Sequence, residues 1–440
     1  MAVAAGSAMQ IMAVSAVTGQ LLATVPCTAD DTVAALRQAI EIGAAERMLL
    51  ALCRSEIDDA PDSCEGGPWR LVHGGRLLKG FETLKKAGIE NGATIAVVRS
   101  PPPKVATSSA DGTARLWCSA SGQCLRVFAG HRSDLGPVAF SPRGELLVTA
   151  SRDSTARTWS TASGKCLQVL RGHRDGIFSA AFSPDGTRIV TASRDASAKI
   201  WASSSGECLA TLQGHGRTVY AAGFSPDGHL VATSSLDGTC RLWGSTSGAC
   251  LCVLEGHRDA VYMAAFSPDG QQLATASKDS TGRLWNIASG DFSPPSRVLT
   301  GHGDALFAAD FSPDGDLLVT ASFDGAARLW TSATGLCLRT LEGHLSAVYC
   351  AAFSPEGDAV VTTSRDSTAR LWNVASGSCL HTLEGHRALV YSARFSSDGE
   401  LLVTAGADHT AMVWSRASGE CLQVFEGHQA VVGSVDFAPG

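Results

Sequence analysis

The chain has 440 residues and a formal net charge of −7, and its composition is 45% hydrophobic and 18% charged. This length exceeds one ordinary core and indicates either several domains or a large repeat array. The negative charge does not favour nucleic acid or anionic membranes as partners, and no apolar run reaches the roughly 18 residues that a membrane helix needs. Abundant serine, threonine, glycine and valine favour short strands joined by tight turns.

The N-terminal segment, residues 1–27, contains no charged residue and superficially resembles a secretory signal. It lacks the basic start of such a signal, and Gln10, Thr18 and Gln20 interrupt its apolar residues. We therefore expect residues 1–8 to be disordered and a folded domain to begin at Met9.

Residues 9–99 predict a small α+β domain. An apolar segment at 9–14 before the turn Thr18-Gly19 predicts a hairpin, and Thr32, Val33, Leu36 and Ile40 have the spacing of a helix face. With the segment Arg70–Leu84 and the closing residues 94–99, this part of the chain resembles ubiquitin, which implies a β-grasp fold.

The resemblance to ubiquitin implies a recognition patch at Val17, Val72 and Val98, which would bind receptors of the ubiquitin system. These valines could equally be ordinary strand residues. No diglycine follows Arg99, so we do not expect conjugation to other proteins. The proline-rich residues 100–104 predict a linker.

From residue 105 to 440 the sequence repeats. A Gly-His pair recurs every 42 residues, with one step of 45, at His131, His173, His215, His257, His302, His344, His386 and His428. An aspartate followed six residues later by a tryptophan keeps the same period, from Asp111 and Trp117 to Asp408 and Trp414. Each unit also carries a Phe-Ser-Pro-like turn between short apolar runs, which predicts four strands per unit.

These units resemble WD repeats, the blades of a β-propeller. The resemblance implies eight blades, with seven as the alternative, and the chain could also be part of a longer array. The first Asp-Trp pair has no upstream Gly-His, whereas the last Gly-His has no following Asp-Trp. We therefore expect a C-terminal strand to complete a blade with the three N-terminal strands, and His428 to join Asp111 and Trp117.

In WD repeats the histidine, aspartate and tryptophan share a hydrogen-bond network with a strand hydroxyl. One such set is His173, Asp195 and Trp201, with Thr191 or Ser193 as the hydroxyl. Because the histidines lie on separate blades, we expect no metal site, no cofactor and no catalytic residue among them. The cysteine of each S-G-x-C-L segment, as in Cys166, predicts a small buried residue and a reducing compartment.

Positions that vary between otherwise similar units are candidates for partner binding. Five residues after the histidine stand aromatic side chains in six units: Phe178, Tyr220, Tyr262, Phe307, Tyr349 and Tyr391. Directly before the aspartate stand four basic residues: Arg152, Arg194, Lys278 and Arg365. Tyrosine and arginine are frequent in binding hot spots. The expected partner is a protein or peptide, acidic or phosphorylated, with an apolar anchor; the alternative is that the aromatic residues only pack.

The sequence thus predicts a non-enzymatic interaction scaffold in the cytoplasm, and also in the nucleus, whose ubiquitin-like domain contacts the ubiquitin–proteasome system. Two alternatives stay open. One is a substrate receptor of a ubiquitin ligase, although the W-D-x-R sequence is absent after every tryptophan. The other is a signalling scaffold similar to G-protein β subunits. No phosphate-binding loop, H-E-x-x-H or nucleophile-elbow motif indicates an enzyme.

Overall fold

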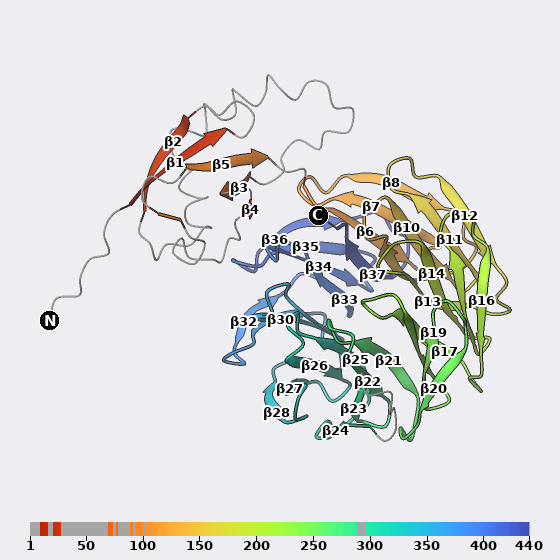
Figure 1. The fold of residues 1–440 in the computed structure, drawn as a ribbon. Coiled ribbons are helices and arrows are strands. Elements are labelled where there is room, and N and C mark those ends of the chain that lie inside the picture. The colour runs from red at the N-terminus through yellow and green to blue at the C-terminus, as the bar shows by residue number, and fades with distance from the viewer. Residues whose placement is uncertain are drawn as a thin grey trace. The chain divides into compact units, whose positions relative to one another are not determined.

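The computed structural model describes residues 9–15, 21–27, 69–73, 76–77, 89–90, 94–99, 102–287 and 295–439. The chain forms two compact units, residues 1–103 and 104–440, both drawn in Figure 1. Several predictions fall outside the described residues: the disorder of residues 1–8, Val17, the helix around Thr32–Ile40 and residues 100–101 of the linker. In the described parts of the chain no helix is long and apolar enough to cross a membrane.

The first unit contains a five-stranded mixed sheet in the order β2-β1-β5-β3-β4. Its strands are β1 (Met9–Ser15), β2 (Leu21–Cys27), β3 (Trp69–His73), β4 (Arg76–Leu77) and β5 (Thr94–Arg99). β1 pairs antiparallel with β2 and parallel with β5. Val72 lies on β3 opposite Ala96, and Val98 lies on β5 opposite Arg70. The ubiquitin-like fold itself stays a prediction.

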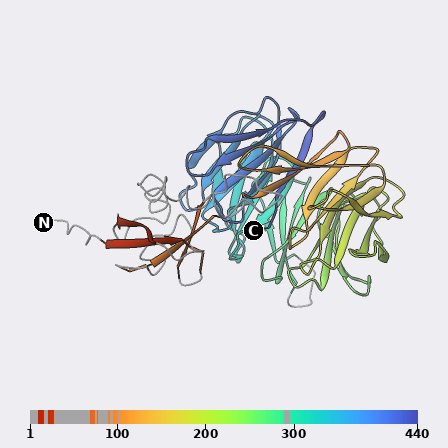
Figure 2. The same ribbon diagram turned by 90° about the horizontal axis from the view of Figure 1, so that it is seen from above.

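The second unit consists of eight four-stranded antiparallel sheets, whose colours run from orange through green to blue in Figures 1 and 2. The innermost strands are β9 (Leu135–Phe140), β13 (Ile177–Phe182), β17 (Val219–Phe224), β21 (Val261–Phe266), β25 (Leu306–Phe311), β29 (Val348–Phe353), β33 (Val390–Phe395) and β37 (Val432–Phe437). Next come β10 (Leu146–Ser151), β14 (Arg188–Ser193), β18 (Leu230–Ser235), β22 (Gln272–Ser277), β26 (Leu317–Ser322), β30 (Ala359–Ser364), β34 (Leu401–Gly406) and β6 (Lys104–Ser109).

The two outer positions of each blade complete the sheets. The third strands are β11 (Thr155–Ser160), β15 (Ser197–Ala202), β19 (Cys240–Gly244), β23 (Gly282–Asn286), β27 (Ala327–Thr331), β31 (Ala369–Asn373), β35 (Ala411–Ser415) and β7 (Thr113–Cys118). The outermost are β12 (Cys166–Arg171), β16 (Cys208–Gln213), β20 (Cys250–Leu254), β24 (Arg297–Leu299), β28 (Cys337–Leu341), β32 (Cys379–Leu383), β36 (Cys421–Phe425) and β8 (Cys124–Ala129).

The eight-bladed prediction is confirmed, and the seven-bladed alternative is wrong. β37 pairs antiparallel with β6 in the sheet β37-β6-β7-β8, with Phe437 opposite Val105. Figure 1 shows the blue β37 beside the orange β6. Lys104, which we assigned to the linker, begins β6 because its carbonyl accepts a hydrogen bond from the Ala438 N–H at 2.8 Å.

Apolar side chains fill the spaces between neighbouring blades. Trp372, for example, packs in a cluster with Val348 and Val360 of its own blade and with Val319 and Leu329 of the preceding one. The second strand of each blade is therefore almost wholly buried, whereas an outermost strand such as β16 buries one residue of six. The predicted burial of the repeat cysteines is wrong for this reason: those that begin β12, β16, β20, β28, β32 and β36 are exposed.

Candidate functional site

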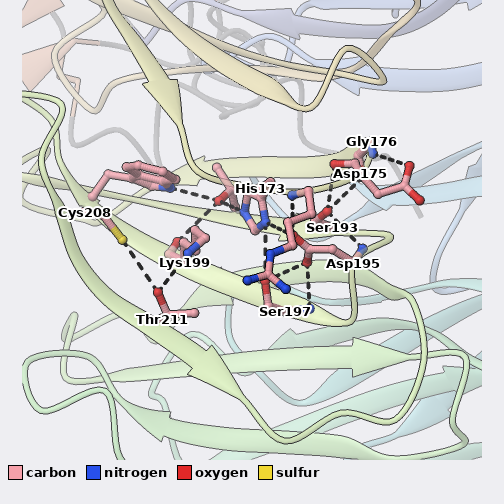
Figure 3. A network of polar contacts seen from close by, with 12 residues as sticks. His173, Asp175, Gly176, Ser193, Asp195, Ser197, Lys199, Cys208 and Thr211 are labelled. Atoms are coloured by element: carbon pink, nitrogen blue, oxygen red, sulfur yellow. Dashed lines mark hydrogen bonds and ion pairs between the residues drawn. The ribbon is translucent and has the colours of Figure 1, made fainter.

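A hydrogen-bond network fixes the loops at one end of each blade. In the blade of β13–β16, Trp201 donates its Nε1–H to the Thr191 hydroxyl at 2.9 Å, and that hydroxyl lies 2.8 Å from His173 Nε2. His173 Nδ1 lies 2.8 Å from Asp195 Oδ2 (Figure 3). The hydroxyl of the network is thus that of Thr191, because Ser193 instead donates to the Asp175 carbonyl and accepts from the Asp195 N–H.

The network favours an ionised aspartate beside a neutral histidine. Burial alone would raise the pKa of Asp195, but hydrogen bonds from the Ser197 hydroxyl, the Arg174 N–H and His173 lower it to about 2. Burial lowers the pKa of His173, and Asp195 only partly opposes that shift. Because the aspartate can only accept, Nδ1 carries the imidazole proton and Nε2 accepts the proton of the Thr191 hydroxyl. The hydroxyl of Ser197, two residues after the aspartate, was missed by the sequence interpretation.

The closing blade repeats this network across the two ends of the propeller. His428 Nδ1 lies 2.9 Å from Asp111 Oδ2, and its Nε2 lies 2.8 Å from the Thr107 hydroxyl. Trp117 donates to the same hydroxyl at 2.9 Å. Among the described residues, no three histidine, cysteine, aspartate or glutamate side chains gather closely enough to hold a metal ion.

The six predicted aromatic residues form a continuous arc around the channel at the start of the innermost strands. Neighbouring rings are 5.1–5.8 Å apart between centroids, in the order Phe178, Tyr220, Tyr262, Phe307, Tyr349 and Tyr391. None is fully buried, and Tyr391 is 36% exposed. The arc is open where Gly136 and Gly433 take the same position. The structure thus brings these residues together, but in an arc and not a closed ring.

The predicted basic residues lie beside the arc, but most have an acidic partner. Arg152 pairs with Asp134 at 3.4 Å, Arg194 with Asp175 at 3.8 Å and Lys278 with Asp259 at 3.2 Å. Arg365 has no ion pair within 4.0 Å among the described residues. The basic character expected of this surface is therefore largely neutralised, except in the blade that carries Arg365.

Charges inside the channel were missed by the sequence interpretation. Directly before the repeated phenylalanine, five units carry alanine or glycine, whereas three carry Asp310, Arg394 and Asp436. Asp310 accepts the Phe353 N–H at 3.1 Å and Asp436 accepts the Phe140 N–H at 3.2 Å, so each carboxylate joins two adjacent blades. Burial raises the pKa of Asp436 to about 6, although Arg394 opposes the shift.

Asp436 also lines a cavity of about 490 Å³ at the other end of the innermost strands. The cavity is bounded by the Phe-Ser-Pro turns, including Phe140, Phe182, Phe224 and Phe437. The two ends of the channel therefore differ, since one presents the aromatic arc and the other a vestibule of turn residues around one carboxylate.

Comparison with known protein families agrees with this geometry. The family model described as WD domain, G-beta repeat, matches seven segments that together cover more than half of the chain: residues 122–160, 164–202, 206–244, 248–286, 293–331, 335–373 and 377–415. The chain belongs to the WD40 family. Each WD40 segment spans the outermost strand of one blade and three strands of the next, so the repeats interlock around the propeller.

A curated relative shares one short stretch of this WD40 protein. The nuclear distribution protein PAC1 of Mycosarcoma maydis is 50% identical over 44 residues, which is 10% of this chain and 10% of the relative. The match therefore has the length of a single WD40 repeat, and the chain spans about a tenth of the relative's length.

Proposed function

We propose that this WD40 protein is a non-catalytic scaffold that binds a protein partner on the aromatic arc. The single observation that carries the proposal is the arc itself: six aromatic side chains in mutual contact, on six consecutive innermost strands, and open to solvent. Rigid, partly exposed aromatic residues supply a large contact area at little entropic cost, which is why they dominate binding hot spots.

The scaffold around the arc supports this role. The aspartate of each network also accepts the N–H of the residue after the histidine, as Asp195 accepts that of Arg174 at 2.9 Å. This bond anchors the loop that leads into the innermost strand and its aromatic side chain. A surface held rigid in this way loses little entropy when a partner binds.

We also propose that residues 9–99 form a ubiquitin-like domain that contacts receptors of the ubiquitin–proteasome system. The antiparallel pairing of β1 with β2 supports the first hairpin that the resemblance implies. Val72 and Val98 lie on the paired strands β3 and β5, which is compatible with a shared patch. The domain would bring a partner held on the arc to that system.

A reducing compartment, the cytoplasm or the nucleus, is the proposed location. Eleven cysteines of the described residues are free thiols, and six of these are exposed. Oxidising compartments favour disulfides over so many accessible thiols. The role in nuclear distribution that the relative's name states is not carried over, because the shared stretch amounts to about one repeat.

Affinity capture from the source lysate tests the binding surface. The full chain would be compared with a variant in which Tyr220, Tyr262, Tyr349 and Tyr391 are alanine, after circular dichroism shows that both are folded. A matched control replaces four exposed leucines of the outermost strands, Leu167, Leu209, Leu251 and Leu380, by alanine. Partners lost only from the tyrosine variant support the proposal. An unchanged set of partners contradicts it, and capture of a ligase adaptor would favour the substrate-receptor alternative.

A further inference from the structure

One sector of the arc differs from the rest in its exposed apolar surface. In the loop before β29, Leu345 follows the network histidine and is 90% exposed. The other seven units carry a polar residue or glycine there: Arg132, Arg174, Gly216, Arg258, Gly303, Arg387 and Gln429. The Leu345 N–H donates to Asp366 at 2.9 Å, so the backbone is fixed while the side chain packs on little of the protein.

The arc is also wider in this sector. Phe323, in the turn before Asp324, is 36% exposed, and its ring centroid lies 5.1 Å from that of Phe307 and 6.0 Å from that of Tyr349. No other unit has an aromatic residue at this position of the turn. Phe323, Tyr349 and Tyr391 therefore form one partly exposed apolar area on neighbouring blades. Leu345 adds an exposed apolar side chain in the loop that leads into the strand of Tyr349. A single exposed apolar residue would need no explanation, but several on neighbouring blades indicate a binding surface.

Basic side chains that have no ion pair among the described residues border the same area. The aspartates that pair with Arg152, Arg194 and Lys278 stand in the loops after the network histidine. The corresponding loops here, residues 344–348 and 386–390, contain no acidic residue. Across the described residues, neither Arg365 nor Arg387 has a carboxylate within 4.0 Å, and both are exposed.

The neighbouring network carboxylates do not cancel these two charges by direct contact. Asp366 accepts from the Leu345 N–H and from the Thr368 N–H and hydroxyl, and it contacts His344. Its oxygen atoms are therefore occupied within the network. Arg365 and Arg387 are left with donors for an anionic ligand.

We propose that this sector binds an acidic peptide segment of a partner, with one apolar side chain of the peptide seated among Phe323, Leu345, Tyr349 and Tyr391. Arg365 and Arg387 hold the flanking anionic groups, which are carboxylates or phosphates. This inference rests on the proposed function and adds the sector and the chemistry of the partner. Preformed apolar contacts bordered by two exposed arginines supply both the anchor and the charge complementarity that a specific site needs.

Fluorescence anisotropy with labelled synthetic peptides and the full chain tests the inference. The first peptide has a central phenylalanine flanked by aspartates; the second replaces the phenylalanine by alanine; the third replaces the aspartates by lysines; the fourth carries phosphoserines in place of the aspartates. We expect binding of the first and fourth peptides only, weakened by salt. Tighter binding of the fourth would indicate a phosphorylated partner, and tighter binding of the first an acidic one.

Substitutions within the sector can be matched to residues that other units already carry. Leu345→Gln introduces the residue of Gln429, and Phe323→Ala introduces that of Ala407. Each should weaken peptide binding about tenfold or more, as loss of a hot-spot side chain does. Arg365→Ala and Arg387→Ala should weaken binding and reduce its salt dependence. The control Arg174→Gln introduces the same residue at the corresponding position of the β13 blade and should leave affinity unchanged.

The inference is overturned if no peptide binds, if the lysine peptide binds as well as the aspartate peptide, or if Leu345→Gln has no larger effect than Arg174→Gln. These outcomes differ from failure of the proposed function. If lysate partners are still lost from the tyrosine variant, the arc binds a partner and only the assignment of sector and peptide chemistry is wrong.

Discussion

His428 and Asp111 lie 317 residues apart in the sequence, yet His428 Nδ1 is 2.9 Å from the Asp111 carboxylate. This pair closes the propeller, since His428 leads into β37 and Asp111 forms the turn between β6 and β7. Because β37 pairs with β6, β6 has a neighbouring strand on both sides and is not left as an exposed edge. The polar network that shapes each blade therefore also holds the two ends of the array together.

Replacing a network histidine should destabilise the propeller. His428→Ala and His173→Ala each leave a largely buried carboxylate without its imidazole partner, and each should cost about 1–3 kcal/mol in urea unfolding. Only His428→Ala should also speed amide exchange in β6 and β37, because only that histidine joins the two ends. Equal exchange of β6 and β37 in both variants would show that strand pairing alone closes the ring.

The stability of the fold should decrease as the pH falls below about 6.5. Burial lowers the pKa of seven network histidines below the ordinary 6.5: His131, His173, His215, His302, His344, His386 and His428. Below pH 6.5 the unfolded chain therefore binds protons that the folded chain does not, which favours unfolding. A melting temperature at pH 5 equal to that at pH 7.5 would contradict the neutral state of these histidines.

Asp436→Asn should stabilise the propeller at pH 7.5. Burial raises the pKa of Asp436 from 3.8 to about 6, so the ionised form is disfavoured in the folded state. At 1.36 kcal/mol per pKa unit the gain is at most about 3 kcal/mol, and it should vanish by about pH 3, where the carboxyl is protonated in both states. The asparagine oxygen still accepts the Phe140 N–H. Lower stability of the variant at pH 7.5 would mean that attraction to Arg394 outweighs the cost of burial.

Alkylation of the native protein should separate the cysteines by their place in the blade. We expect fast reaction at the six exposed thiols, Cys166, Cys208, Cys250, Cys337, Cys379 and Cys421. Cys118 and Cys240 are buried, and burial raises the pKa of the Cys240 thiol, so both should react only after unfolding. Peptide mass spectrometry after a short pulse of iodoacetamide measures each site, and protection of the outer thiols would indicate that a partner or a second copy covers the rim.

The regular period of the sequence was sufficient to predict the blades. The spacing of histidine, aspartate and tryptophan predicted eight units and placed His428 with Asp111, because these residues satisfy one another inside each blade. Period alone could not choose between Thr191 and Ser193, which point to the same face. The repeat pattern also led to the wrong prediction that the repeat cysteines are buried. An outermost strand such as β16 has a neighbouring strand on one side only, which leaves Cys208 exposed.

Other features depend on contacts that a repeat pattern does not contain. The ion pairs of Arg152, Arg194 and Lys278 arise because two different loops meet beside the arc. The channel charges had a signal in the sequence, since Asp310, Arg394 and Asp436 replace small residues in only three units. That signal becomes interpretable once the position is known to face the channel.

Hydrogen–deuterium exchange on the full chain, alone and with a partner obtained by affinity capture, tests the central claim most directly. If the partner binds the aromatic arc, protection should concentrate in the loops and strand starts at residues 172–180, 214–222, 256–264, 301–309, 343–351 and 385–393. Exchange at the Phe-Ser-Pro turns and in the outermost strands should stay unchanged. Protection confined to those turns or to the outer strands would contradict the account and place the binding surface elsewhere on the propeller.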